Sequence, residues 1–154
     1  MYSKNQSEFT VEIEEKQASI EALESKLKET RPYKDLMEIE KLLKEDEITR
    51  KLKCIAHGKG NRPSNDDWHT FENLFDNHLP RFLAQLMKIE PPISEPEMRI
   101  CLLVKAGFKT DEIATLMDYT PSTISKYKAR LLLKIFNEEN GGAKEFEKRL
   151  LKMS

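Results

Sequence analysis

The stretch "DEIATLMDYTPSTISKYKARLLLKIF", residues 111–136, contains two helical patterns separated by only a few residues. Thr110 stands in front of the first pattern as a candidate N-cap, and Thr120 precedes the second, which opens with Pro121 at a position where helices accept proline. One apolar face of the first pattern is formed by Ile113, Leu116 and Met117. Because two helices joined by a tight turn make a helix-turn-helix, this stretch predicts an all-α domain built around that motif.

The connection between the two helices needs one residue with positive φ. Glycine is the usual choice, but Asp118 is the candidate here, since Asp tolerates the left-handed region better than most residues. Tyr119 and Ile124 stand at the spacing of a hydrophobic staple around the start of the second helix. The turn is therefore specified by local chemistry on both sides.

The second helix divides into two faces when its residues are placed about 100° apart. Its apolar side, which we expect to pack, consists of Ile124, Tyr127, Leu131 and Ile135. The opposite side carries Ser122, Ser125, Lys126, Ala129 and Arg130. We predict that this side contacts base edges in a major groove, because serines donate or accept hydrogen bonds, cations reach guanine acceptors, and alanine permits close approach.

Five further side chains are candidates for contacts with DNA phosphates. Thr110, Thr120 and Thr123 lie near helix N-termini, where free amides and hydroxyls suit phosphate oxygens. Lys128 and Lys134 have stems long enough to carry their ammonium groups toward the sugar–phosphate backbone. Together these residues are expected to fix the helix on the duplex.

The formal net charge of −1 argues neither for nor against nucleic-acid binding, so the distribution of charge along the chain must be considered. Residues 94–154 contain 11 Lys and Arg against 9 Asp and Glu, and residues 121–137 contain no acidic residue. A basic helical face often serves only to keep a protein soluble. Here the tight turn, the capped start and the acid-free run together favour nucleic-acid binding.

The N-terminal part predicts a coiled coil. Apolar residues occupy steps of four and three at Phe9, Ile13, Ile20, Leu23 and Leu27, with Lys16 filling one slot of the pattern. Pro32 marks a break, and a second run follows up to Gly58, with Leu36, Ile39, Leu43, Ile48, Leu52 and Ile55. We expect residues 1–57 to form a helical dimerisation region, with a homodimer held through residues 9–57; a solitary solvated helix is the alternative.

The stretch "GKGNRPSND", residues 58–66, concentrates turn-forming residues and predicts a linker over 58–65. A helical domain over 66–154 would follow, containing the helix-turn-helix (94–136) and a C-terminal helix (144–152). Two apolar faces separated by a bend near Pro80 are expected in its core, formed by Trp68, Phe71, Leu74 and Phe75, and by Phe82, Leu83 and Leu86. Ser94 and Glu97 stand at the spacing of a capping box, and the helix that they open should end at Gly107.

The sequence gives little support for a metal site or a catalytic site. The residues Cys54, His57, His69 and His78 match no standard zinc spacing, and no nucleophile with a base and an orienting group is recognisable. We therefore expect no catalytic residue, no metal and no cofactor. With no apolar window of membrane-spanning length, no signal peptide and only two unpatterned cysteines, we expect a cytoplasmic protein without a membrane segment.

The segment "PPISEPEMRICLLVKAGFKTDEIATLMDYTPSTISKYKARLLLKIF" resembles the helix-turn-helix of the LuxR/GerE and sigma-factor region 4 groups. With "DDWHTFENLFDNHLPRFLAQL" before it, residues 46–153 look similar to the C-terminal part of Bacteroidetes regulators in which a coiled coil precedes such a domain. The resemblance implies a DNA-binding transcriptional regulator. By position it gives the recognition role to Ser122, Ser125, Lys126 and Ala129.

Two alternatives remain open. The chain could be a protein–protein interaction or scaffold module, or a sigma-like factor that also contacts RNA polymerase. Related regulators often carry a sensor, repeats or a membrane segment ahead of the coiled coil, so the chain is either part of a longer regulator or a short one with an unknown input.

Overall fold

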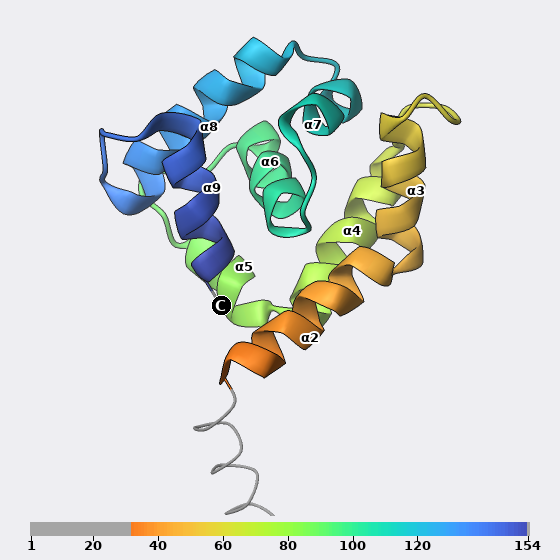
Figure 1. The fold of residues 1–154 in the computed structure, drawn as a ribbon, viewed down its shortest axis with the longest axis horizontal. Helices are drawn as coiled ribbons and strands as arrows, with labels where there is room; N and C mark the ends of the chain where they lie inside the picture. Colours follow the sequence, from red (N-terminus) through yellow and green to blue (C-terminus); the bar gives the residue numbers. More distant parts are fainter. Residues whose placement is uncertain (1–31, 154) are drawn as a thin grey trace, which may run out of the picture. The chain divides into compact units, whose positions relative to one another are not determined.

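The computed structural model describes residues 32–153, and all regular secondary structure in that range is α-helical (Figure 1). The predicted all-α class is confirmed. The chain divides into two compact units, residues 1–38 and 39–154, and α2 (Pro32–Glu45) runs across the division. The second unit also holds α3 (Glu47–Ala56), α4 (Asn65–His78), α5 (Pro80–Met87), α6 (Glu95–Lys105), α7 (Thr110–Met117), α8 (Pro121–Phe136) and α9 (Gly142–Lys152). The predicted seam at residues 9–30 lies outside the described part.

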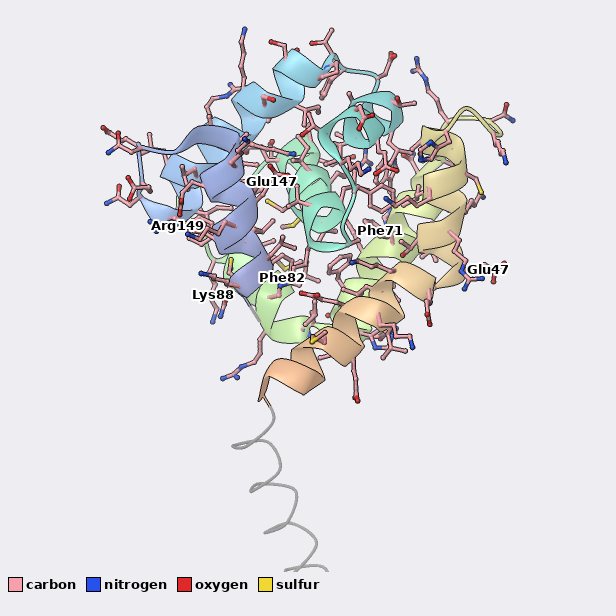
Figure 2. The ribbon with its side chains drawn as sticks, in the orientation of Figure 1. Glu47, Phe71, Phe82, Lys88, Glu147 and Arg149 are labelled. Atoms are coloured by element: carbon pink, nitrogen blue, oxygen red, sulfur yellow. The ribbon has the colours of Figure 1, made fainter. Side chains whose placement is uncertain are left out.

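Helix α6 is the centre of the second unit, in contact with α4, α7, α8 and α9 (Figure 1). Six consecutive residues at its end, 100–105, are buried, which suits a helix covered on all sides. The aromatic faces expected on α4 and α5 are buried as predicted, and Phe71 and Phe82 are labelled in Figure 2. Phe71 packs edge-to-face on Phe75, with ring centroids 5.2 Å apart, and Phe75 contacts Phe82 of α5 at 6.0 Å, which joins the two faces into one core.

Local signals in the sequence place several of the helix ends correctly, although α9 begins at Gly142 and not at residue 144. Ser94 and Glu97 form the predicted capping box at the start of α6, and a second box, between Ser64 and Asp67, opens α4. The bend before Pro80 separates α4 from α5 as predicted. Gly107, with φ +90°, follows the last turn of α6, because the left-handed region there costs glycine nothing.

The position of the domain boundary differs from the prediction. Leu43, Leu52 and Ile55 are buried in the same core cluster as Phe71, so α3 belongs to the unit that contains all later helices. The loop at 58–65 therefore joins two helices within one unit. It follows that the part of the predicted dimer seam between residues 39 and 57 packs inside its own chain, because a side chain buried there is not available to a second copy.

The C-terminal helix packs on α8 and α6. Phe146 and Leu150 are fully buried, whereas Leu151 is 38% exposed. The buried ammonium group of Lys105 donates hydrogen bonds to the carbonyl oxygens of Leu151, at 2.8 Å, and Met153. Lys105 thus satisfies carbonyl groups that the end of a helix leaves unpaired.

Candidate nucleic-acid interface

Helices α7 and α8 are joined by three residues, Asp118 to Thr120. Asp118 has φ 60° and ψ 43°, so the positive φ predicted for this residue is confirmed. Its backbone N–H donates to the carbonyl of Thr115, and that of Tyr119 donates to the carbonyl of Ala114. These bonds close the end of α7 and allow the chain to turn at once into α8.

The start of α8 is capped as the sequence predicts. The Thr120 hydroxyl accepts a hydrogen bond from the backbone N–H of Thr123 at 3.1 Å, and Pro121 occupies the first turn. The side-chain oxygens of Thr120 and Thr123 lie 2.9 Å apart. One of the free donors at this helix end is satisfied within the chain, and the exposed hydroxyl of Thr120 remains at the surface.

The predicted base-contacting residues lie on the outer side of α8. Ser122, Lys126, Ala129 and Arg130 are exposed and Ser125 is half-buried, whereas Ile124 and Leu131 on the opposite side are completely buried. The helix therefore presents a surface of small and cationic side chains to solvent. We call these five residues, Ser122, Ser125, Lys126, Ala129 and Arg130, the α8 outer face.

Aromatic rings support one edge of the α8 outer face. Tyr119 and Tyr127 are stacked, with centroids 5.7 Å apart, and the guanidinium carbon of Arg130 lies 4.7 Å from the Tyr127 ring centre. A hydrogen bond with Tyr127 raises the pKa of the Tyr119 hydroxyl. Because the guanidinium rests on a ring, fewer Arg130 rotamers remain to be lost when the group binds a partner.

The position of Lys128 differs from its predicted role as a phosphate contact. Its side chain is fully buried, its ammonium group donates to the Thr110 hydroxyl at 2.7 Å, and Glu147 of α9, labelled in Figure 2, lies 3.3 Å from it. Burial lowers the pKa of Lys128, and the Glu147 carboxylate raises it by a smaller amount. Lys128 is therefore a structural cation that joins α7, α8 and α9, and its ammonium group is not free for phosphate.

Lys134 is also engaged within the chain. Its ammonium group donates to the carbonyl oxygen of Pro92 at 2.8 Å and to Glu97 at 2.9 Å, with 20% of the side chain exposed. Burial raises the pKa of Glu97, but the Ser94 N–H and Lys134 outweigh it, so the pKa is lowered overall. In this structure Lys134 holds the end of α8 to the start of α6, which differs from the predicted phosphate contact.

The first residue of α7 also differs from the prediction, because Lys109 rather than Thr110 takes the N-cap position. The Lys109 N–H donates to Glu112 at 2.8 Å. Lys53 of α3 and the His57 ring that follows it contact the same carboxylate at 2.7 and 2.8 Å. Burial would raise the pKa of Glu112, but these hydrogen bonds together lower it. The buried Glu112 carboxylate thus holds α7 against α3 through two partners that remain partly exposed.

The loop between α3 and α4 reaches the turn between α7 and α8. The Arg62 guanidinium lies 2.7 Å from the Asp118 carboxylate, and both side chains are largely exposed. In Figure 1 this loop lies beside the end of α3 that faces α7. Asp118 thus combines two roles, since it adopts the left-handed conformation and anchors a cation from a distant loop.

Several of these relationships were missing from the sequence interpretation. The burial of Lys105, Glu112 and Lys128 and the pairing of Arg62 with Asp118 were not predicted. The pattern did contain one signal: on the helical wheel Lys128 lies at the edge of the apolar side of α8, where a cation needs an internal partner. Nothing in the local sequence identified those partners, because they come from other helices.

The residues considered as metal ligands are not assembled into one site. His57 contacts Glu112, and Cys54 is an exposed free thiol. Across residues 32–153, no three His, Cys, Asp or Glu side chains are grouped so that they could hold a metal ion. Nor does any helix in that range combine the length and apolar character needed to cross a membrane.

Comparison with protein-family models, with curated proteins and with solved structures finds no match to this chain.

Proposed function

We propose that this chain is a DNA-binding transcriptional regulator that places the α8 outer face in the major groove. The observation that carries the proposal is the composition and exposure of that face: serine, alanine and two cations at the surface, with no acidic residue from Pro121 to Asn137. Such a surface suits the acceptor-rich edges of guanine and the negative potential of the groove. The proposal implies a cytoplasmic protein without catalytic activity.

The contacts that hold α8 against its neighbouring helices also support this function. A recognition helix must hold its side chains in register with base pairs, so motion of the helix costs affinity. Two ion pairs join α8 to neighbouring helices, Lys128 with Glu147 and Lys134 with Glu97, and a third, Glu112 with Lys53, joins α7 to α3. Lys128 and Lys134 thus position the helix, which leaves base and phosphate contacts to Lys126, Arg130 and the exposed Thr120.

The experiment is selection of bound DNA from a random pool, followed by titration with salt. We expect enrichment of one sequence and an affinity that falls steeply as salt rises, because bound cations release counterions from the duplex. A steep salt dependence without sequence enrichment would reduce the proposal to non-specific binding. No binding at low salt would reject it.

Substitution of the α8 outer face identifies the surface that binds. Lys126→Ala and Arg130→Ala should each weaken binding to the selected sequence by about 1–3 kcal/mol if they contact bases. Lys88→Ala is the matched control, since it removes one exposed cation that follows α5 and does not belong to the α8 outer face. Equal affinity of all three variants and the wild-type protein would reject the assignment of this face.

We propose further that the regulator is a homodimer held by the predicted coiled coil at residues 9–30. Linking two recognition helices raises affinity through effective concentration, and it predicts a DNA site with two half-sites. Leu23→Asp should convert the dimer to a monomer in sedimentation experiments, with Glu24→Asp as the control. A wild-type protein that is monomeric at all concentrations would contradict the dimer.

One observation favours a second candidate, a protein-binding role that includes a sigma-like contact with RNA polymerase. Leu133 is 46% exposed and lies one helical turn beyond Ala129, at the end of the α8 outer face. Leu133→Ala separates the two roles: loss of RNA polymerase binding with unchanged DNA binding supports the second candidate, whereas DNA binding by a wild-type protein that does not bind RNA polymerase supports DNA recognition alone.

A further inference from the structure

The loop between α3 and α4 carries two exposed cations, Lys59 and Arg62, beside the turn that precedes α8. Arg62 forms an ion pair with Asp118 at this place, with a distance of 2.7 Å between Nη2 and Oδ2. The Arg62 side chain remains 72% exposed. Because a guanidinium has five N–H donors and a single nitrogen is engaged here, most of its donors face solvent.

A hollow of about 420 Å³ lies between the same loop, α3 and the start of α4. It is lined by the cations Lys51, Lys59 and Arg62, together with the polar or small residues Asn61, Ser64 and Gly60. Asp67 also lines it, but its carboxylate lies 2.8 Å from Lys51, whose hydrogen bond lowers the pKa of Asp67. Because the Asp67 carboxylate is paired with Lys51, the charges of Lys59 and Arg62 make this surface suited to an anion.

The chain itself limits the distance between this loop and the α8 outer face. Asp118 and Ser122 are four residues apart, so their backbones are separated by at most about 14 Å. The major groove is about 12 Å wide, and a sugar–phosphate strand borders it on either side. A cation anchored on Asp118 is therefore within reach of the strand that flanks a helix inserted through Ser122.

We propose that the α3–α4 loop, through Arg62 and Lys59, is a second DNA-contacting element that holds the backbone phosphate strand beside the recognition helix. This inference rests on the proposed function and adds to it a binding surface from outside the two helices. Asp118 positions the Arg62 guanidinium, while the remaining N–H groups of that guanidinium bind a phosphate oxygen in bidentate fashion. Lys59 adds a point charge to the same strand.

The test is a salt titration of Arg62→Ala, Lys59→Ala and Lys88→Ala on the sequence selected by the wild-type protein. Removal of one phosphate-binding cation should reduce the slope of log affinity against log salt by about 0.9. At fixed low salt, Arg62→Ala should weaken binding about five-fold, the size expected for an exposed ion pair. The order of preference among sequences should stay the same, because phosphate contacts carry no direct sequence information.

Arg62→Lys separates charge from geometry. It should restore most of the salt slope but only part of the affinity, since an ammonium cannot make the bidentate contact. Thermal unfolding checks that each variant is folded, and little change is expected because the Arg62–Asp118 pair is exposed.

The outcomes distinguish this inference from the function on which it rests. If Arg62→Ala and Lys59→Ala bind as the wild type does while Lys126→Ala and Arg130→Ala bind weakly, the loop does not touch DNA and the proposed function stands. A slope change in Lys88→Ala as large as in Arg62→Ala would overturn the inference as well, because it would indicate diffuse attraction. Wild-type behaviour of all five variants would reject both proposals.

Discussion

The ammonium group of Lys128 lies 2.7 Å from the Thr110 hydroxyl, within the interior of the helical unit. This contact joins the first residue of α7 to the middle of α8. It holds the two helices together at a part-buried position, where a hydrogen bond is stronger than at a fully exposed one. The neighbouring Lys126 is exposed, so two lysines that are two positions apart belong to different environments.

Substitution of these two lysines by methionine should separate their roles. Lys126→Met is expected to weaken DNA binding and reduce its salt slope, whereas Lys128→Met should leave the slope unchanged and lower the free energy of unfolding. Because Glu147 keeps 34% of its side chain exposed, water can solvate it after the change. The destabilisation should then be smaller than the roughly 3–5 kcal/mol seen when a fully buried pair is broken. Urea unfolding and DNA titration measure both effects; a changed slope in Lys128→Met would contradict its structural role.

The Glu112 cluster should be essential for the packing of α3 on α7. Glu112→Gln removes the charge that pairs with Lys53 and His57 while keeping the size of the side chain. We expect the free energy of unfolding to fall by about 1–3 kcal/mol, because hydrogen bonds to a charged group are lost in a buried position. Glu139→Gln, at an exposed position, is the control. A decrease of the same size in both variants would show that overall charge, and not this cluster, is responsible.

Acid should destabilise the protein through the same carboxylates. The pKa values of Glu112 and Glu97 are below the ordinary value of 4.5 in the folded state, so the unfolded state binds more protons as the pH falls below that value. The free energy of unfolding should therefore be constant above about pH 6 and decline from about pH 5 downward. Urea unfolding between pH 3 and 7 tests this, and Glu112→Gln should flatten the curve. A wild-type curve without slope in this range would contradict it.

The turn between α7 and α8 should tolerate few residues at position 118. Asp118→Asn and Asp118→Gly retain access to the left-handed region at φ 60°, whereas Asp118→Val should lower the free energy of unfolding by about 1–3 kcal/mol. The side chain is exposed, so the difference reports backbone strain and not a change in packing. Thermal unfolding of the three variants is the measurement, and equal midpoints for Val and Asn would disprove the strain.

The end of α9 should depend on Lys105. Lys105→Met removes the donor to the carbonyl oxygens of Leu151 and Met153, so the last turn of α9 should exchange its amide hydrogens faster. Lys152→Met, in the same turn but exposed, is the control. Unchanged exchange in Lys105→Met would show that the apolar packing of Phe146 and Leu150 holds the helix without this cap.

The sequence by itself predicted the helices of the described region and many of their ends. Caps such as Thr120 and Ser94, the left-handed residue Asp118 and the apolar faces act over a few neighbouring residues, so they are readable without a fold. For the same reason, the side of α8 that faces solvent followed from its period of about 3.6 residues. The boundary at 58–65 was wrong, because turn-forming residues are the same in a loop inside one unit and in a linker between two.

Tertiary structure alone decided what each charged residue does. Lys128 and Lys134 were predicted to reach phosphate, yet Glu147, Thr110 and Glu97, which hold them, come from positions 18 to 37 residues away. Arg62 and Asp118 are brought together from elements that are distant in the sequence. A long cationic side chain pairs with whichever group the fold places within its reach. Once the cation is buried, the free-energy cost of desolvation keeps it paired with that group. The local pattern identifies a helix face, but only packing determines which of its charges remain free to bind a partner.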